Sequence, residues 1–127
     1  MSNIPIANND KRRLLIFEDE HSMQTILTEV FISEKFQLEF VSKEAIGKNN
    51  ASNPQLILLD HTSAPLSHVE NLCQKIKMFF PAIPLIVLSA YPLNNFCNYA
   101  KHMDLFIAKP FDLNYFLNSV ESCLITD

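Results

Sequence analysis

Four short, unbroken apolar runs constrain the fold of this chain more than any other feature. They lie at 14–17, 56–59, 85–88 and 105–108. Each run has the length of a strand and is too short for a helix, and an unbroken run is typical of a strand that is buried on both faces. Such strands form parallel sheets covered by helices on both sides. A less apolar strand is predicted at 37–41, where Gln37 and Glu39 alternate with apolar residues.

Helical patterns separate these strands. Apolar residues at helical spacing predict a first helix over 23–31, and a short one is expected at 42–48, near Gly47. Ser67 to Glu70 fits a capping box that opens a third helix, Pro92 starts a fourth and Asp112 caps a fifth. Five strands that alternate with five helices predict an α/β fold, a doubly wound five-stranded parallel sheet.

The length of 127 residues and the 48% hydrophobic content predict one compact domain. Residues 1–12 are expected to form a polar N-terminal arm, and residues 13–127 the single domain. The basic run at 11–13 is interpreted as a solvated lead-in to the first strand. Because the sequence stops soon after the fifth helix, no output domain is expected in this chain.

Charge and cysteine content narrow the classes of function. The formal net charge of −4 argues against direct binding of nucleic acid or of an anionic membrane. Cys73, Cys97 and Cys123 are far apart and form no zinc-binding spacing, so we expect a reducing compartment. Since no apolar segment is long enough for a signal peptide or a membrane span, the sequence predicts a cytoplasmic protein.

Chemically useful side chains follow four of the five predicted strands. Glu18 and Asp19 follow the first strand, Asp60 the third, Ser89 the fourth and Lys109 the fifth. In a doubly wound sheet the ligand crevice lies at the carboxyl ends of the strands, so these side chains should meet there. Three converging carboxylates would repel one another by about 4 kcal/mol per pair at ~4 Å. With one lysine to offset them, a hard divalent cation is expected, most naturally Mg²⁺.

Asp60 is the best candidate for a chemical role. It follows the most apolar strand, and the residues after it, 61–66, form a predicted loop that would leave it open to a donor. With a cation, an ammonium and a hydroxyl close by, its carboxylate could accept a phosphoryl group.

This set of motifs resembles the receiver domain of bacterial two-component response regulators, which has the (βα)5 flavodoxin-like fold. The matching segments are 14–20, 56–60, 85–90 and 109–111, in the family's order. The resemblance implies that a histidine kinase or a phosphotransfer protein passes a phosphoryl group to Asp60. It also implies that Asp19, Asp60 and the backbone carbonyl of Thr62 bind Mg²⁺ directly, and that Glu18 acts through water.

The same resemblance implies a switch. Ser89 and Lys109 would contact the phosphoryl oxygens, the Lys109–Pro110 bond would be cis, and Phe106 would turn inward when Ser89 moves. The surface formed by the fourth helix, the fifth strand and the fifth helix would then repack and be read by a downstream protein partner, with a homodimer as a further candidate. Such a domain is not a turnover enzyme, since it catalyses only its own phosphorylation and dephosphorylation.

Other interpretations stay open. A pseudo-receiver would keep the fold and bind a protein without phosphorylation. A small phosphatase with an aspartate nucleophile would need a second acid two residues after Asp60, where Thr62 stands. His21 and His61 flank the acidic residues and could bind a softer metal, but exposed positions in a loop or first turn are expected for both.

Overall fold

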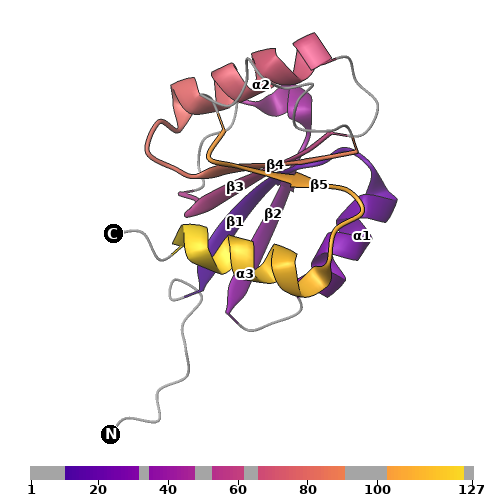
Figure 1. The fold of residues 1–127 in the computed structure, drawn as a ribbon. Helices are drawn as coiled ribbons and strands as arrows, with labels where there is room; N and C mark the ends of the chain where they lie inside the picture. The colour runs from indigo at the N-terminus through magenta and orange to yellow at the C-terminus, as the bar shows by residue number, and fades with distance from the viewer. Residues whose placement is uncertain (1–10, 32–34, 48–52, 62–65, 91–102, 125–127) are drawn as a thin grey trace, which may run out of the picture.

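The computed structural model describes residues 11–31, 35–47, 53–61, 66–90 and 103–124 (Figure 1). Five parallel strands form one sheet in the order β2-β1-β3-β4-β5. Their bounds are Arg12–Phe17 for β1, Phe36–Val41 for β2, Leu56–His61 for β3, Leu85–Ser89 for β4 and Leu105–Ala108 for β5. The predicted α/β architecture with a five-stranded parallel sheet is confirmed.

Burial follows strand position. Every residue of the inner strands β3 and β4 is buried, as is the apolar part of β1 from Leu14 to Phe17. The edge strand β2 alternates between half-buried and exposed residues, because water reaches one of its faces. Three of the four apolar runs therefore marked strands that are buried on both faces. The prediction was wrong for the fourth run, at 105–108, which forms the edge strand β5, where only Ile107 is buried.

The described helices are α1 (His21–Val30), α2 (Leu66–Phe79) and α3 (Leu113–Leu124). Figure 1 shows α2 on one side of the sheet and α1 and α3 on the other. Two hydrophobic cores result. The α2-side core joins Leu59 and Val87 to Val69 and Ile76, and the opposite core joins Leu58 and Leu88 to side chains of α1 and α3. This is the doubly wound arrangement predicted from the alternating pattern.

The helices differ from the predictions in two boundaries and in the burial of one residue. Residues 42–48 were expected to form a helix, but only the 3-10 turn η2 (Lys43–Ala45) is present, and Gly47 follows it with φ of +82°. Helix α2 begins at Leu66, so Ser67 lies in its first turn and cannot be its N-cap. Ile26, predicted on the buried face of α1, is 51% exposed. The helix predicted from Pro92 lies outside the described residues.

The cap of α3 is confirmed, since Asp112 Oδ2 accepts a hydrogen bond of 2.9 Å from the Tyr115 amide. Arg12 and Arg13 were predicted to belong to a solvated segment before the first strand, but both make contacts with the folded domain. Arg12 belongs to β1 and forms an ion pair with Glu121, and Arg13 Nε donates to the Asn53 carbonyl at 2.7 Å. Among the described helices, none has the length and apolar character needed to cross a membrane.

A polar cluster joins three elements at the amino ends of β4 and β5. Asp104 Oδ2 accepts hydrogen bonds from the Leu85 amide at 2.7 Å and from Lys77 Nζ at 2.9 Å. Lys77 Nζ also donates to the Ile83 carbonyl at 2.7 Å. The end of α2 and the beginnings of both strands are thereby bound to one another.

Candidate functional site

The candidate site lies at the carboxyl ends of β1, β3, β4 and β5. Parallel pairing places His61 of β3 beside Ser89 of β4. The Lys109 amide donates to the Ser89 carbonyl at 2.7 Å, which extends the ladder between β4 and β5 by one residue. Lys109 is thus held next to Ser89 by backbone geometry, and the chain turns at the cis Lys109–Pro110 peptide bond, as the resemblance implied.

Asp60 and Lys109 form the central pair of the site. The ammonium of Lys109 contacts Oδ1 of Asp60 as an ion pair, and Asp60 is completely buried. The sequence predicted a loop after Asp60 that leaves it open. That prediction was wrong for His61, which continues the buried strand, while residues 62–65 lie outside the described part of the chain. The lysine points inward, which the proposed chemistry requires.

Glu18 is the second buried acid. It is 2% exposed, and its Oε2 accepts a 2.9 Å hydrogen bond from the Glu20 amide. Burial raises the pKa of Glu18 to about 7, and the adjoining Asp60 raises it further through hydrogen bonding and charge repulsion, while the Glu20 amide and Lys43 oppose the shift. Glu18 therefore gains and loses its proton near neutral pH, well above the range of an ordinary carboxyl group.

Asp19 does not join these two acids. Its side chain is exposed, and its Oδ1 accepts a 3.1 Å hydrogen bond from the amide of Lys43, the first residue of η2. Within the described ranges, no three His, Cys, Asp or Glu side chains lie close enough together to hold a metal ion. Thr62, whose carbonyl was expected to be a ligand, lies outside those ranges. The structure thus brings together Glu18, Asp60 and Lys109 and leaves Asp19 at the surface.

The oxygen atoms present fit a hard divalent cation. Glu18 Oε1 is buried and accepts no hydrogen bond from any residue that the structure describes. A buried carboxylate oxygen in this state, next to a second buried carboxylate, is the kind of ligand atom that Mg²⁺ prefers. Glu18 and Asp60 could therefore hold such an ion, directly or through water.

His61 is the residue that the sequence interpretation missed. It was expected to be exposed, but it is 2% exposed, and its Nδ1 lies 3.2 Å from Ser89 Oγ. His21 is exposed in the first turn of α1, as predicted. The sequence offered one signal for His61, which is its position directly after Asp60. If the strand extends past its apolar run, His61 is part of it and is buried, and a buried polar side chain needs a hydrogen-bond partner.

Ser89 and Phe106 share one face of the sheet. Ser89 is fully buried, and Phe106 is partly buried and packs against the α2-side core. Their strands are paired in register, Val87 with Phe106 and Ser89 with Ala108. The two predicted switch residues are therefore on adjoining strands and on the same face of the sheet.

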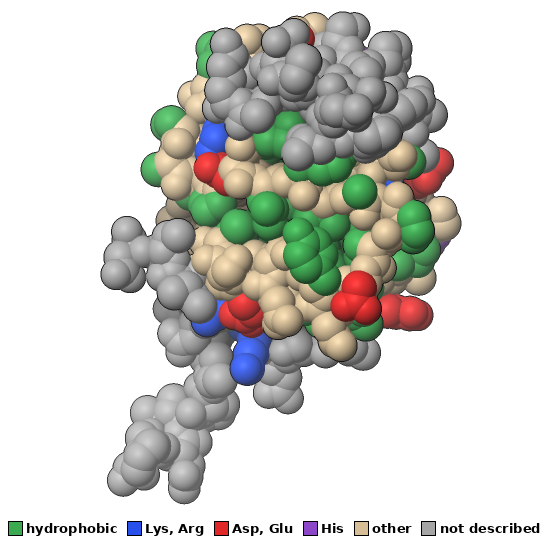
Figure 2. All heavy atoms as spheres, viewed as in Figure 1, with side chains coloured by type: hydrophobic (Ala, Val, Ile, Leu, Met, Phe, Trp, Pro, Cys, Tyr) green, Lys and Arg blue, Asp and Glu red, His purple; other side chains and the backbone are tan. Residues whose placement is uncertain are grey.

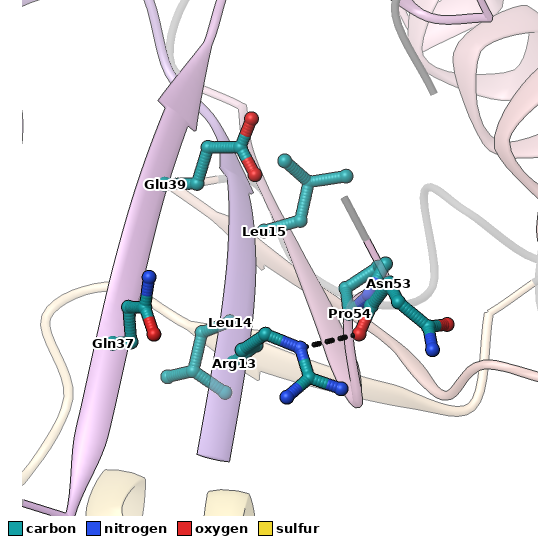
Figure 3. Close-up of a pocket in the computed structure, with 7 residues that line it drawn as sticks. All are labelled: Arg13, Leu14, Leu15, Gln37, Glu39, Asn53 and Pro54. Atoms are coloured by element: carbon teal, nitrogen blue, oxygen red, sulfur yellow. Dashed lines mark hydrogen bonds between the residues drawn. The ribbon is translucent and has the colours of Figure 1, made fainter. Parts of the chain in front are cut away.

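The cavity in Figure 3 lies away from the buried acids Glu18 and Asp60. It has a volume of about 340 Å³ and is lined by residues of β1, β2 and the approach to β3: Arg13, Leu14, Leu15, Gln37, Glu39, Asn53 and Pro54. The guanidinium of Arg13 closes one side through its bond to the Asn53 carbonyl. The lining of this cavity contains one acidic residue, Glu39, and one basic residue, Arg13, and none of the predicted site residues.

No family model matches the chain. A curated relative, sporulation initiation phosphotransferase F of Bacillus subtilis (strain 168), is 27% identical over 124 residues, which cover 88% of this chain and 93% of the relative. The alignment therefore spans almost the whole length of both proteins.

Solved structures agree on the fold. A response regulator from Thermotoga maritima aligns over 91% of this chain and 99% of its own, with a TM-score of 0.75 and 20% identity. A CheY-like receiver domain protein from Methanospirillum hungatei aligns over 90% and 94%, with a TM-score of 0.76 and 19% identity. Response regulator TrrA from Thermotoga maritima, in complex with Mg²⁺ and BeF, aligns over 89% and 99%, with a TM-score of 0.73 and 21% identity.

These comparisons confirm the resemblance inferred from the motifs. The chain has the fold of a response regulator receiver domain, the flavodoxin-like CheY fold, and its acid-lysine pair occupies the carboxyl edge of that fold.

Proposed function

We propose that the chain is a phospho-receiver that accepts a phosphoryl group on Asp60. The observation that carries this proposal is the ion pair between Lys109 and a completely buried Asp60 at the carboxyl end of the central strand β3. Burial of a charged carboxylate costs free energy even when an ammonium is paired with it, and buried charged groups of this kind are concentrated at functional sites. The relative from Bacillus subtilis is named as a phosphotransferase, which supports the same assignment.

The chemistry is the transfer of one phosphoryl group from a phosphorylated histidine of the donor to the free carboxylate of Asp60. A carboxylate oxygen of Asp60 forms the new O–P bond, the P–N bond of a donor phosphohistidine breaks, and the imidazole nitrogen keeps that electron pair. Water later cleaves the acyl phosphate, which restores the carboxylate and releases inorganic phosphate. Lys109 stabilises the negative charge on the transferring group, and the hydroxyl of Ser89 donates to a phosphoryl oxygen.

Mg²⁺ is the proposed cofactor, and it would neutralise charge on the phosphoryl oxygens when bound. Asp60 and Asp19 are proposed as direct ligands with the Thr62 carbonyl, and Glu18 as a ligand through water. For this, Asp19 would have to exchange the Lys43 amide for the ion. TrrA, a neighbour in fold, was crystallised with Mg²⁺ and BeF, which supports the choice of ion.

The proposed output surface includes β5 and α3. Figure 2 shows hydrophobic side chains gathered on the face that carries these elements. Leu113 and Tyr115 of α3 are 48% and 53% exposed, so their apolar atoms are accessible to a partner. Together with the helix predicted from Pro92, they would form the surface that a downstream protein reads. Ser89 and Phe106 would couple this surface to Asp60.

The proposed donor is a histidine kinase or a histidine phosphotransfer protein. A downstream protein, or a second copy of this chain, would bind the phosphorylated form. A cytoplasmic location is proposed as well, because such partners act on the cytoplasmic side. The chain would perform one phosphorylation cycle at a time on itself and would not turn over a separate substrate.

A pseudo-receiver is the second candidate. The position of Asp19 favours it, since the third acid is bonded to the Lys43 amide instead of facing Asp60. In that case the chain would bind its partner equally well with and without beryllofluoride, and Asp60→Asn would leave this binding unchanged.

Intact-mass measurement after incubation with acetyl phosphate separates the two functions. We expect one added phosphoryl group in the presence of Mg²⁺, and none after chelation or in Asp60→Asn. The label should be lost on mild alkaline treatment, as an acyl phosphate is. Lys109→Arg should keep the label but weaken partner binding, because the cation is retained with a different shape. An acid-stable label on Asp60→Asn would show that another residue is the acceptor.

A further inference from the structure

The imidazole of His61 faces the hydroxyl of Ser89 inside the protein. Nδ1 and Oγ are 3.2 Å apart, and both residues are buried, at 2% and 0% exposure. The pairing of β3 with β4 places the two residues opposite each other, so the contact follows from sheet register. A hydrogen bond between two buried groups restricts the orientation of both.

Asp60 and His61 point to opposite faces of the sheet, because side chains alternate along a strand. The neighbours of each residue agree with this. Leu59, two residues before His61, packs in the α2-side core, and Leu58, two residues before Asp60, packs in the core formed with α1 and α3. Ser89 shares the α2 side with His61. The hydroxyl of Ser89 is therefore held on the α2 side of the sheet, opposite to the face on which the side chain of Asp60 leaves β3.

We infer that His61 is a positioning residue that holds Ser89 in the unphosphorylated conformation. This inference rests on the proposed function, since it concerns the step in which Ser89 reaches a phosphoryl group on Asp60. To do so, Oγ must move away from Nδ1, and the hydrogen bond between them is weakened or lost. His61 thereby opposes the movement of Ser89 toward a phosphoryl group on Asp60. The contact of Ser89 with that group has to be more favourable than the hydrogen bond to His61.

The expected size of the effect is that of one buried hydrogen bond. Such a bond contributes roughly a factor of five to an equilibrium between two conformations. His61→Phe keeps a flat ring of similar size but has no Nδ1, so we expect it to bind beryllofluoride about five times more tightly in the presence of Mg²⁺. His61→Asn places an amide group near the position of Nδ1 and should stay within about twofold of the parent chain.

The experiment is a titration with beryllofluoride and Mg²⁺, followed by ¹⁹F NMR of the bound fluoride. It is performed on the parent chain, on His61→Phe and His61→Asn, and on both substitutions in a Ser89→Ala background. If His61 acts through the hydroxyl, the tighter binding of His61→Phe disappears when Ser89 is alanine. A residue with only a packing role would change affinity equally in both backgrounds.

The outcomes are distinct. Failure of the parent chain to bind beryllofluoride contradicts the proposed function. If the parent chain binds, two results would overturn the role of His61. One is that His61→Phe binds beryllofluoride no more tightly than the parent chain. The other is that His61→Phe tightens binding by the same factor in the Ser89→Ala background.

A measurement on the parent chain does not depend on folding of a variant. The ¹⁵N resonance of His61 Nδ1 reports its hydrogen bond, and it should shift when beryllofluoride and Mg²⁺ are added. In Ser89→Ala the same resonance should already be displaced and should respond little. A resonance in the parent chain that stays fixed during saturation would contradict the inference.

Discussion

Glu18 and Asp60 are buried side by side at the ends of β1 and β3, and this arrangement raises the pKa of Glu18 to about 7. An acid with a raised pKa in the folded state binds its proton more tightly there than in the unfolded chain. Its contribution to stability is present at low pH and is lost as the pH rises through about 7.

The first prediction follows from this pKa. The free energy of unfolding of the parent chain should fall relative to that of Glu18→Gln, by up to about 3 kcal/mol, between about pH 5 and about pH 8. Glutamine keeps an oxygen that can accept from the Glu20 amide but does not titrate. Urea unfolding of both chains across this range measures the difference. Parallel curves would show that Glu18 titrates normally.

The second prediction concerns Mg²⁺. If the ion binds beside the ionised form of Glu18, binding must displace the proton, so its affinity should increase as the pH rises through about 7. Mg²⁺ should then raise the melting temperature more at about pH 8 than at about pH 6. Asp60→Asn is the control and should show a smaller response at both values. An equal response at both pH values would place the ion away from Glu18.

The third prediction tests the ion pair of Lys109 and Asp60. Lys109→Met leaves a buried carboxylate without its ammonium partner and should lower the free energy of unfolding by about 3 kcal/mol. In an Asp60→Asn background the same substitution should lower it by less than about 1 kcal/mol, because no charge remains to be compensated. Chemical denaturation of the four chains gives the coupling energy. Additive effects would mean that the two side chains do not interact in solution.

The fourth prediction concerns Gly47, which follows η2 with φ of +82°. A Cβ at this position would lie 2.6 Å from Cζ of Phe79 at the end of α2. Because the phenyl ring is 43% exposed and can turn away, most of the destabilisation should come from the backbone. We expect Gly47→Ala to lower the free energy of unfolding by about 1–2 kcal/mol.

The matched control is Phe79→Ala, alone and together with Gly47→Ala. If the backbone dominates, the alanine at 47 should have nearly the same effect in both backgrounds. A large reduction of the effect without the ring would assign the destabilisation to the steric contact instead.

The apolar runs predicted the central strands because a strand with helices on both faces leaves no polar position until it emerges from the core. Placing Asp60 and Lys109 together followed from the rule that carboxyl ends of parallel strands share one edge. These inferences depend on connectivity and burial, which sequence patterns record well. The cap at Asp112 is similarly local, since it needs only one side chain and the amide three residues later.

Other features depend on contacts that no local pattern records. The pattern at 42–48 did not indicate how Gly47 would meet Phe79, and only one 3-10 turn formed. Asp19 and Glu18 are neighbours in sequence, yet one is buried and the other bonds to the Lys43 amide, because adjacent side chains leave a strand end in different directions. His61 was predicted to lie in a loop because the apolar run ends before it, but β3 extends through His61.

The cluster of Lys77, Asp104 and Leu85 gives the two ends of the sheet different mechanical characters. At the amino ends, a shared carboxylate clamps a helix and two strands. At the carboxyl ends, the side-chain contacts include the ion pair of Lys109 with Asp60 and the contact of His61 with Ser89. A phosphoryl group on Asp60 would therefore change side-chain contacts at one end of the sheet, while the cluster at the other end holds the beginnings of β4 and β5 in place.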